Sequence, residues 1–319
     1  MILKKLVAER RFREAVECYH SHESLVDRRN PERQLLAADA AARLGELTLG
    51  QQLAVAAFEQ FASTGRHQAL VPTSNLLGAI AFERGQVGHA HGYFSKAILL
   101  ARRHDDLPML ARVSNNLATL THFRGGSEAA IPLYQESARL FEGLEDRRGE
   151  AEASHNLGLL FRQLDRLEEA DAAATKAVRL AESAHDRSLQ ALATLGQAEV
   201  TIEREDFQLA RHQIVRGAAL AAEADDQLNG IEAGRLRALL TFRQGDFAIA
   251  HHLAEVAGCV AGNLGSGLLR AECVALSALA LRGLGRMTEA AARREEAVGA
   301  FQDFGAQAKI ERLEKDWPA

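Results

Sequence analysis

The feature that most constrains this chain is a small residue that recurs every 40 positions. The longest series of this kind keeps its register over six intervals: Gly50, Ala90, Ala130, Ala170, Ala210, Ala250 and Ala290. A period of about 20–50 residues indicates a repeat architecture, in which each repeat is one supersecondary unit that buries its apolar face only against its neighbours. We therefore expect a solenoid rather than a set of independent globular domains.

Two further series of small residues share this period. The first is Ala38, Gly78, Ala118, Gly158, Ala198, Ala238 and Ala278. The second is Ala57, Ala97, Ser137, Ala177, Gly217, Ala257 and Ala297. Small side chains at fixed places in every repeat predict two antiparallel helices that approach each other closely.

The breaks between helices are periodic as well. One turn series is Gly45, Gly85, Gly125, Asp165, Glu205, Gly245 and Gly285. A second series has the residue types that cap helix N-termini: Asp106, Asp146, Asp186, Asp226 and Ser266. An aspartate there accepts hydrogen bonds from free N–H groups of the first turn and favours the positive end of the helix dipole. Each repeat is therefore predicted to be two helices.

Composition supports an all-α chain and excludes several classes of partner. The sequence has only five prolines and 5% aromatic residues, and it is rich in alanine and leucine, which favour helix. The net charge of −5 comes without a basic run, so no nucleic-acid partner is expected. No apolar run is long enough for a signal peptide or a membrane span. The three cysteines, Cys18, Cys259 and Cys273, lack C-x-x-C spacing and suit reduced core thiols in the cytoplasm.

Several repeats resemble the tetratricopeptide family. The residues that carry the resemblance are Asn156-Leu157-Gly158 with Ala170 and Ala177, Leu77-Gly78 with Ala90, Phe94 and Ala97, and Asn116-Leu117-Ala118 with Ala130 and Tyr134. The common repeat of that family has about 34 residues. The longer period here resembles Pins-type adaptors, bacterial Rap-type peptide receptors and the sensor domains of MalT-like regulators. The resemblance implies a right-handed α-solenoid superhelix of seven repeats over residues 31–306.

The two ends depart from the repeat. Residues 1–30 are interpreted as a partial or capping repeat, in which the second helix follows a shortened first one. Residues 307–319 are expected to form a polar capping helix and tail that cover the last repeat, as solenoids require.

The resemblance also predicts a binding groove, because the first helix of each repeat lines the concave face in this family. Asparagine amides, which both donate and accept hydrogen bonds, recur there at equivalent heights and suit the backbone of an extended peptide. The candidate groove residues are Asn75, Phe82, Arg112, Asn115, Asn116, Thr119, His122, Phe123, Glu152, His155, Asn156, Leu159 and Arg162. Two alternatives stay open: the amides tie adjacent helices together, and Phe82 and Phe123 belong to the core.

Catalytic and metal motifs are missing from the sequence. No H-E-x-x-H, paired C-x-x-C, phosphate loop or G-x-S-x-G motif occurs, so neither a metal nor a cofactor is expected and the chain is not predicted to be an enzyme. The alternative is a composite site from different repeats, such as His122 with Glu152 and His155. No lysine lies on a groove helix of a full repeat, which excludes a lysine-rich carboxylate clamp.

The sequence thus predicts a cytoplasmic scaffold or adaptor that holds an extended or helical peptide segment in its groove. The expected partner is a protein or peptide, with no nucleic acid and no membrane. The alternative is a small-molecule-sensing or self-assembling module of a larger regulator, which would account for self-association.

Overall fold

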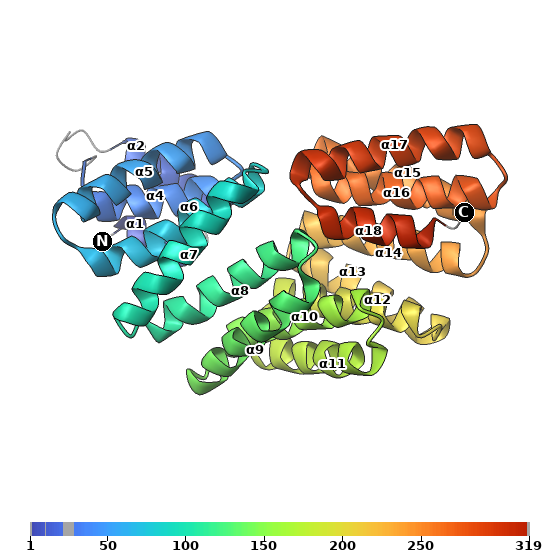
Figure 1. Ribbon diagram of the computed structural model, residues 1–319, viewed down its shortest axis with the longest axis horizontal. Coiled ribbons are helices and arrows are strands. Elements are labelled where there is room, and N and C mark those ends of the chain that lie inside the picture. Colours follow the sequence, from blue (N-terminus) through green and yellow to red (C-terminus); the bar gives the residue numbers. More distant parts are fainter. Residues whose placement is uncertain (1, 10, 22–28, 318–319) are drawn as a thin grey trace. The chain divides into compact units, whose positions relative to one another are not determined.

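The computed structural model describes residues 2–9, 11–21 and 29–317, and this part of the chain contains helices and turns but no strand (Figure 1). The prediction of an all-α fold is confirmed. Two short helices, α1 (Ile2–Ala8) and α2 (Phe12–His20), precede a regular array of helix pairs.

The array alternates first and second helices. The first helices are α4 (Pro31–Arg43), α6 (Leu70–Glu83, preceded by the 3₁₀ turn η1, His67–Ala69), α8 (Leu107–Phe123), α10 (Arg147–Gln163), α12 (Arg187–Glu203), α14 (Gln227–Arg243) and α16 (Gly267–Gly283). The second helices are α5 (Leu47–Ser63), α7 (Val87–Arg103), α9 (Ser127–Gly143), α11 (Leu167–Ser183), α13 (Phe207–Glu223), α15 (Phe247–Asn263) and α17 (Met287–Phe304). A last helix, α18, covers Gln307–Asp316.

Every turn of the array has the same backbone form. Its middle residue has a left-handed φ, at each twentieth position from Gly45 to Gly305, and six of these residues are not glycine: Asp105, Glu145, Asp165, His185, Glu205 and Asp225. The turn after α6 shows the bonding: Gln86 N donates to Ala81 O at 2.8 Å, and Gly85 N donates to Phe82 O at 2.9 Å. These two bonds define a Schellman motif, which satisfies the last carbonyls of a helix. The predicted turn series is confirmed.

Aspartates cap the helices that follow these turns. Four of the predicted caps accept a backbone hydrogen bond at 3.0–3.2 Å: Asp106 from Met109, Asp146 from Gly149, Asp186 from Leu189 and Asp226 from Asn229. Ser266 precedes α16, but its hydroxyl makes no capping bond. Asp206 caps α13 in the same way, with Leu209 N at 3.1 Å, although the sequence series did not include it.

The small-residue series lies at the contacts between paired helices. Every alanine in the series from Ala90 to Ala290 is fully buried. At Gly158 on α10, an added Cβ would stand 3.3 Å from the backbone nitrogen of Ala174 and 3.4 Å from the carbonyl oxygen of Ala170, both on α11. The backbones of α10 and α11 therefore approach as closely as the sequence predicts.

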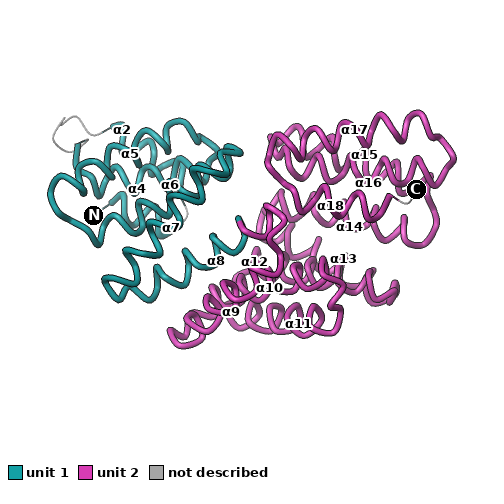
Figure 2. The backbone as a smooth tube through the Cα atoms, in the orientation of Figure 1, with its two compact units in different colours: residues 1–120 teal, residues 121–319 magenta. Residues whose placement is uncertain are grey.

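The chain divides into two compact units, residues 1–120 and residues 121–319 (Figure 2). In unit 1, α1 and α2 pack on α4 through apolar side chains that include Leu3, Tyr19 and Ala37. In unit 2, the core contains Leu195, Ile202 and other buried side chains of α12 to α14. The division falls inside α8 and has no counterpart in the repeat pattern.

The close approach of α10 and α11 makes Gly158 intolerant of a larger side chain. We expect Gly158→Leu to lower the free energy of unfolding by about 1–3 kcal/mol, because overpacking forces the two backbones apart. Urea denaturation followed by circular dichroism measures this loss. Gly230→Leu on α14 is the matched control, since a Cβ at Gly230 meets no atom within 4 Å. Equal stability of the two variants would contradict the close contact.

Candidate functional site

The first helices of unit 2 form the inner side of its curve. Successive helices α10, α12, α14 and α16 contact one another, whereas the second helices of this described region do not pack on each other to that extent. Because the first helices lie closer together than the second helices, the array of helix pairs curves toward the first helices. We call the side of α10, α12, α14 and α16 against which α18 lies the groove face.

Helix α18 was predicted to cover the last repeat. In the structure it also crosses the groove face. Its basic side chains reach acidic residues of three different elements: Lys309 pairs with Glu272 of α16 at 2.8 Å, Arg312 with Glu203 of α12 at 2.8 Å, and Lys315 with Asp165 after α10. Gln163 of α10 also donates to the carbonyl oxygen of Ala308 at 3.3 Å. The predicted helix bounds hold, but its contacts extend back by four helix pairs to α10.

A network of ion pairs lies beneath α18 on the groove face. Three arginines join carboxylates of neighbouring first helices: Arg162 with Glu199 and Glu203 at 3.4 Å each, Arg235 with Glu199 at 3.0 Å and Glu272 at 3.3 Å, and Arg243 with Glu203 at 2.6 Å. Arg235 also pairs with Glu232 of its own helix at 2.5 Å. The side chains of Arg162, Arg235 and Glu199 are only 10–11% exposed. Buried charges of this kind require partners, because burial of an isolated ion is very costly.

The network holds its carboxylates ionised. Burial alone would raise the pKa of Glu199, but the charges of Arg162 and Arg235 outweigh it and hold that pKa far below its usual value. Burial also opposes ionisation of Glu272, yet Lys309 and Arg235 lower its pKa. The groove face thus keeps fixed negative charge at neutral pH.

A cavity of about 320 Å³ remains between α18 and the groove face. Its charged lining is the ion-pair network, and its apolar lining comes from α14, α16, α17 and α18: Leu239, Phe242, Ala275, Leu276, Leu279, Phe301 and Leu313. Each lining residue of α12, α14 and α16 stands 40, 80 or 120 positions after a residue of α10. That residue of α10 is either a predicted groove residue or Gln163, which follows Arg162. The register predicted for the groove in the middle repeats therefore continues to α16.

In unit 1, the structure joins two of the predicted asparagines to each other. Asn116 Nδ2 of α8 donates to Asn75 Oδ1 of α6 at 2.9 Å, so these amides link neighbouring first helices. Thr119 Oγ1 donates to the carbonyl oxygen of Asn115 at 3.0 Å. Two other candidates behave differently: Phe82 packs against a buried cluster of α6 to α8, and Arg112 is exposed.

In unit 2, the predicted residues are in different environments. Phe123 and His155 are buried and belong to the interior, while Asn156 and Leu159 are half-buried. Glu152 pairs with Arg148 at 3.1 Å on the surface. Arg162 lies in the ion-pair network and is already engaged by two carboxylates.

The two histidines of the composite-site hypothesis have different neighbours. His122 shares a hydrogen bond of 3.1 Å with Ser127, and burial together with Lys309 and Arg162 lowers its pKa to about 4. His155 packs against Gly196 of α12, and burial lowers its pKa to about 4 against a small opposing effect of Glu199. Both are therefore neutral at pH 7, and no hydrogen bond or ion pair found in the structure joins either of them to Glu152.

The sequence analysis missed Glu199, Glu203, Arg235, Arg243 and Glu272. The signal was present, since these residues follow the predicted groove positions by multiples of 40. Glu199 stands 40 after Leu159, and Glu272 stands 120 after Glu152. The candidate list stopped in the middle repeats, where the amides are concentrated.

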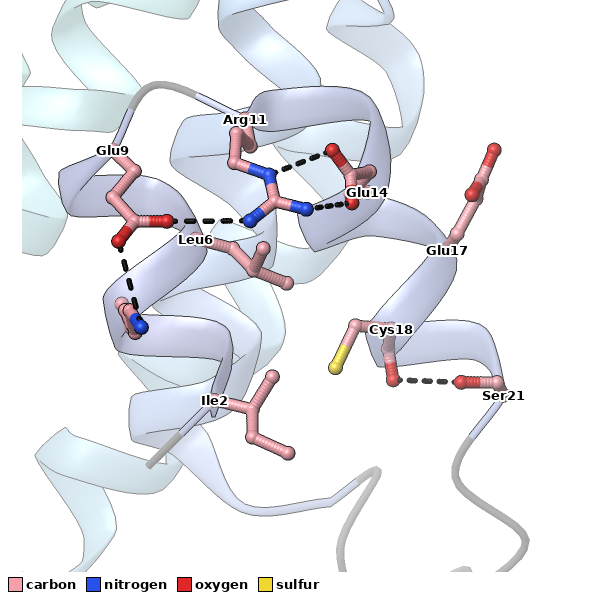
Figure 3. A pocket seen from close by; sticks show the side chains of 9 residues that line it. Ile2, Leu6, Glu9, Arg11, Glu14, Glu17, Cys18 and Ser21 are labelled. Carbon is pink, nitrogen blue, oxygen red and sulfur yellow. Dashed lines mark hydrogen bonds and ion pairs between the residues drawn. The ribbon is translucent and has the colours of Figure 1, made fainter.

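A second hollow, in unit 1, lies beside α1 and α2 and measures about 610 Å³ (Figure 3). Arg11 there pairs with Glu14 and Glu9, and Cys18 lines the same hollow. Cys273 is buried in unit 2, where burial raises the pKa of its thiol to about 12. Within the described ranges, no group of histidine, cysteine and acidic side chains gathers as metal ligands, and no helix is long and apolar enough to cross a bilayer.

Comparisons with known proteins identify the repeat. Residues 109–183 match the model of the tetratricopeptide repeat family. No curated protein matches the sequence. Three solved structures share the fold: a Rap protein complexed with competence and sporulation factor (TM-score 0.75, 14% identity, 99% of this chain and 84% of that one), the Rap conjugation gene regulator of plasmid pLS20 with the Phr* peptide (0.68, 14%, 91% and 77%), and the apo quorum sensor NprR from B. thuringiensis (0.68, 12%, 94% and 85%). At these identities the likeness is one of fold.

Burial of neutral His155 makes stability depend on pH. Its pKa is about 4 in the fold and 6.5 in an unfolded chain, so the unfolded state takes up the proton first. The contribution of His155 to stability is complete above pH 6.5 and falls as the pH drops toward 4, by about 3 kcal/mol for this residue. We expect urea denaturation of His155→Gln to show a loss smaller by that amount over this range.

The exposed residue His212 on α13 provides the control. His212→Gln should keep the pH dependence of the wild type. If His155→Gln kept it too, His155 would not be buried as a neutral group.

Proposed function

Because the helix pairs of this chain form a tetratricopeptide-repeat array, we propose that it is a scaffold that holds a peptide segment of another protein against its first helices. The observation that carries the proposal is the position of α18. The groove face of unit 2 binds a ten-residue helix of the chain itself, through side chains of α10, α12 and α16. A face that holds one helix has the shape and the charges to hold another.

The likeness to solved structures supports this proposal. Of the three similar structures, one is a complex with competence and sporulation factor, one is a complex with the Phr* peptide, and the third is a quorum sensor in its apo form. Peptide recognition by an array of helices requires a rigid groove with a few polar groups in register. The buried small residues of this chain fix the contacts between its helices and so keep the groove rigid. The residues that line the groove of this chain determine which kind of peptide segment can bind there.

The proposed contacts are the candidate residues whose side chains remain accessible. In unit 1 these are Asn75, Phe82, Arg112, Asn115, Asn116 and Thr119, and in unit 2 they are His122, Glu152, Asn156 and Leu159. Arg162 is proposed to act through the ion-pair network, where Glu199 and Glu203 engage it. His155 and Phe123 support them from the interior. Each unit is proposed to use its own first helices.

Site-specific photocross-linking tests the proposal. We expect benzoylphenylalanine at Leu159, on the first helix α10, to capture a partner protein from a lysate after irradiation. The same residue at Leu209, which is exposed on the second helix α13, is the matched control. Mass spectrometry of the adducts identifies the captured segment. Capture at Leu209 and not at Leu159 would place binding on the outer side and refute the proposal.

Substitution of the asparagines gives a second test. Asn156→Ala removes an amide of α10, and we expect it to weaken binding of the captured segment by about tenfold, the value of one charge-assisted or well-placed hydrogen bond. Asn116→Ala also breaks the bond to Asn75, so circular dichroism must show equal helicity before affinities are compared. Asn263→Ala, at the exposed end of the second helix α15, should leave the affinity unchanged.

The cavity under α18 favours a second candidate function, the sensing of a small molecule. Its 320 Å³ is enough for a ligand of modest size, with arginines and carboxylates beside leucine and phenylalanine side chains. A small ligand would raise the midpoint of thermal unfolding in a metabolite screen, and Leu279→Trp, which fills the cavity, would abolish that increase. The peptide function does not require this response.

A further inference from the structure

We propose that α18 is an exchangeable occupant of the groove face, and that the partner of this face is a helix with a basic residue at every third position. This inference rests on the proposed function and specifies its partner. It stands on the arrangement of charges, on the space that α18 leaves unfilled, and on the length and attachment of α18.

Every basic side chain of α18 pairs with an acidic residue elsewhere in unit 2. The net charge of α18 is zero, but Lys309, Arg312 and Lys315 pair with the groove face or the turn after α10. Residues three apart follow one side of a helix. Glu314 is exposed to solvent, Glu311 lies beside Gly125 in the turn after α8, and Asp316 pairs with Arg312 at 2.8 Å. A helix of zero net charge thus presents a basic row to the groove face.

Two of the three acidic groups that receive this row are held in place by the groove face itself. Glu203 is bound by both Arg162 and Arg243, and Glu272 is bound by Arg235. These contacts do not involve α18, so Glu203 and Glu272 are preorganised for any basic helix, whereas Asp165 pairs with Arg312 and Lys315 of α18 itself.

The groove face has an excess of negative charge when α18 is left out. Its network contains three arginines and four carboxylates, and Asp165 in the turn after α10 adds a fifth: Arg162, Arg235 and Arg243 against Glu199, Glu203, Glu232, Glu272 and Asp165. The carboxylates exceed the arginines by two negative charges, which three basic side chains of one helix more than neutralise. Charge complementarity therefore selects a basic helix and disfavours an acidic one.

The apolar fit of α18 is incomplete. Ile310 and Leu313 are buried, but the 320 Å³ cavity stays open between Leu313 and the apolar residues of α14 and α16. A helix with a larger side chain at the place of Leu313 would fill that space and gain contacts that α18 lacks. Such a helix can displace α18 from the groove face.

The attachment of α18 permits exchange. It is only ten residues long and follows Gly305, whose φ of 68° ends α17. An isolated helix of this length is not stable in water, so α18 unfolds when it leaves the groove face. Trp317, stacked beside Arg282 and Arg294 at 5.0 and 5.3 Å, is a second point of attachment after the helix.

Binding of a labelled peptide to the full chain tests the proposal. The probe is a fluorescein-labelled peptide with the sequence of residues 305–317. The first chain is the wild type, and the second carries Lys309→Glu, Arg312→Glu and Lys315→Glu, which reverse the basic row and release α18. We expect fluorescence anisotropy to show at least about tenfold tighter binding to the released chain, because the wild-type face is already occupied.

Matched controls separate charge from other effects. A chain with Glu314→Lys, a reversal on the exposed side of α18, should bind the probe as weakly as the wild type does. A probe with Arg312→Glu should lose binding to the released chain, whereas a probe with Leu313→Phe should bind it several-fold more tightly. Equal binding of the probe by the released and wild-type chains, or equal binding of the two probes that differ at Arg312, would overturn the proposal.

Hydrogen exchange of the wild type provides a test that needs no variant. If α18 exchanges with solution, its amides should lose protection much sooner than those of α16 and α17, which lie in the same unit. Equal protection of the three helices would make α18 a fixed part of the fold and overturn the proposal. A dimer in which copies trade their α18 helices would assign the face to a second copy and overturn the choice of a foreign helix.

These outcomes are distinguishable from a failure of the proposed function. If α18 stays protected while cross-linking at Leu159 still captures a partner, only the exchange is refuted. If the released chain binds the probe but no cellular partner cross-links at the first helices, the exchange holds and the scaffold function falls.

Discussion

The close contact between paired helices is the interaction on which the rest of the structure depends. Fully buried alanines such as Ala90 and Ala170, and glycines such as Gly158, let the two backbones of a pair approach to van der Waals distance. This contact recurs at a constant interval and so gives every first helix the same rotation about its axis. The positions that face the groove are consequently the same in each repeat, and a charge in one helix meets its partner in the next.

Much of the fold could be predicted because its determinants are local and repeated. The turn at Gly85, the cap at Asp146 and the buried Ala170 each follow from a residue type at a fixed spacing. The groove positions were predictable for the same reason, and reading the series onward by 40 would have reached Glu199 and Glu272 as well. Their pairing with Arg162 and Arg235 could not be predicted, because it depends on the distance between side chains of different helices.

The position of α18 lay beyond the repeat pattern. A polar capping helix was predicted within residues 307–319 and α18 forms there, but the pairing of Lys315 with Asp165 joins residues 150 positions apart. The absence of lysine from the first helices was correctly noted, and the structure brings Lys309 to the groove face from outside the repeats. Arg162, one of the predicted groove residues, is already bound by Glu199 and Glu203 and so adds no unpaired positive charge to the groove face.

The regular turns have a consequence for how such a groove changes length. From α8 to α16 each helix has 17 residues, and left-handed turn residues recur at intervals of 20. A deletion or duplication of 40 residues therefore removes or adds one complete layer and leaves every other layer in register. A single inserted residue instead rotates the following part of its helix by about 100° and turns its groove side away. The row of first helices can thus lengthen only by whole repeats of 40 residues, because only a whole repeat keeps every groove position in register.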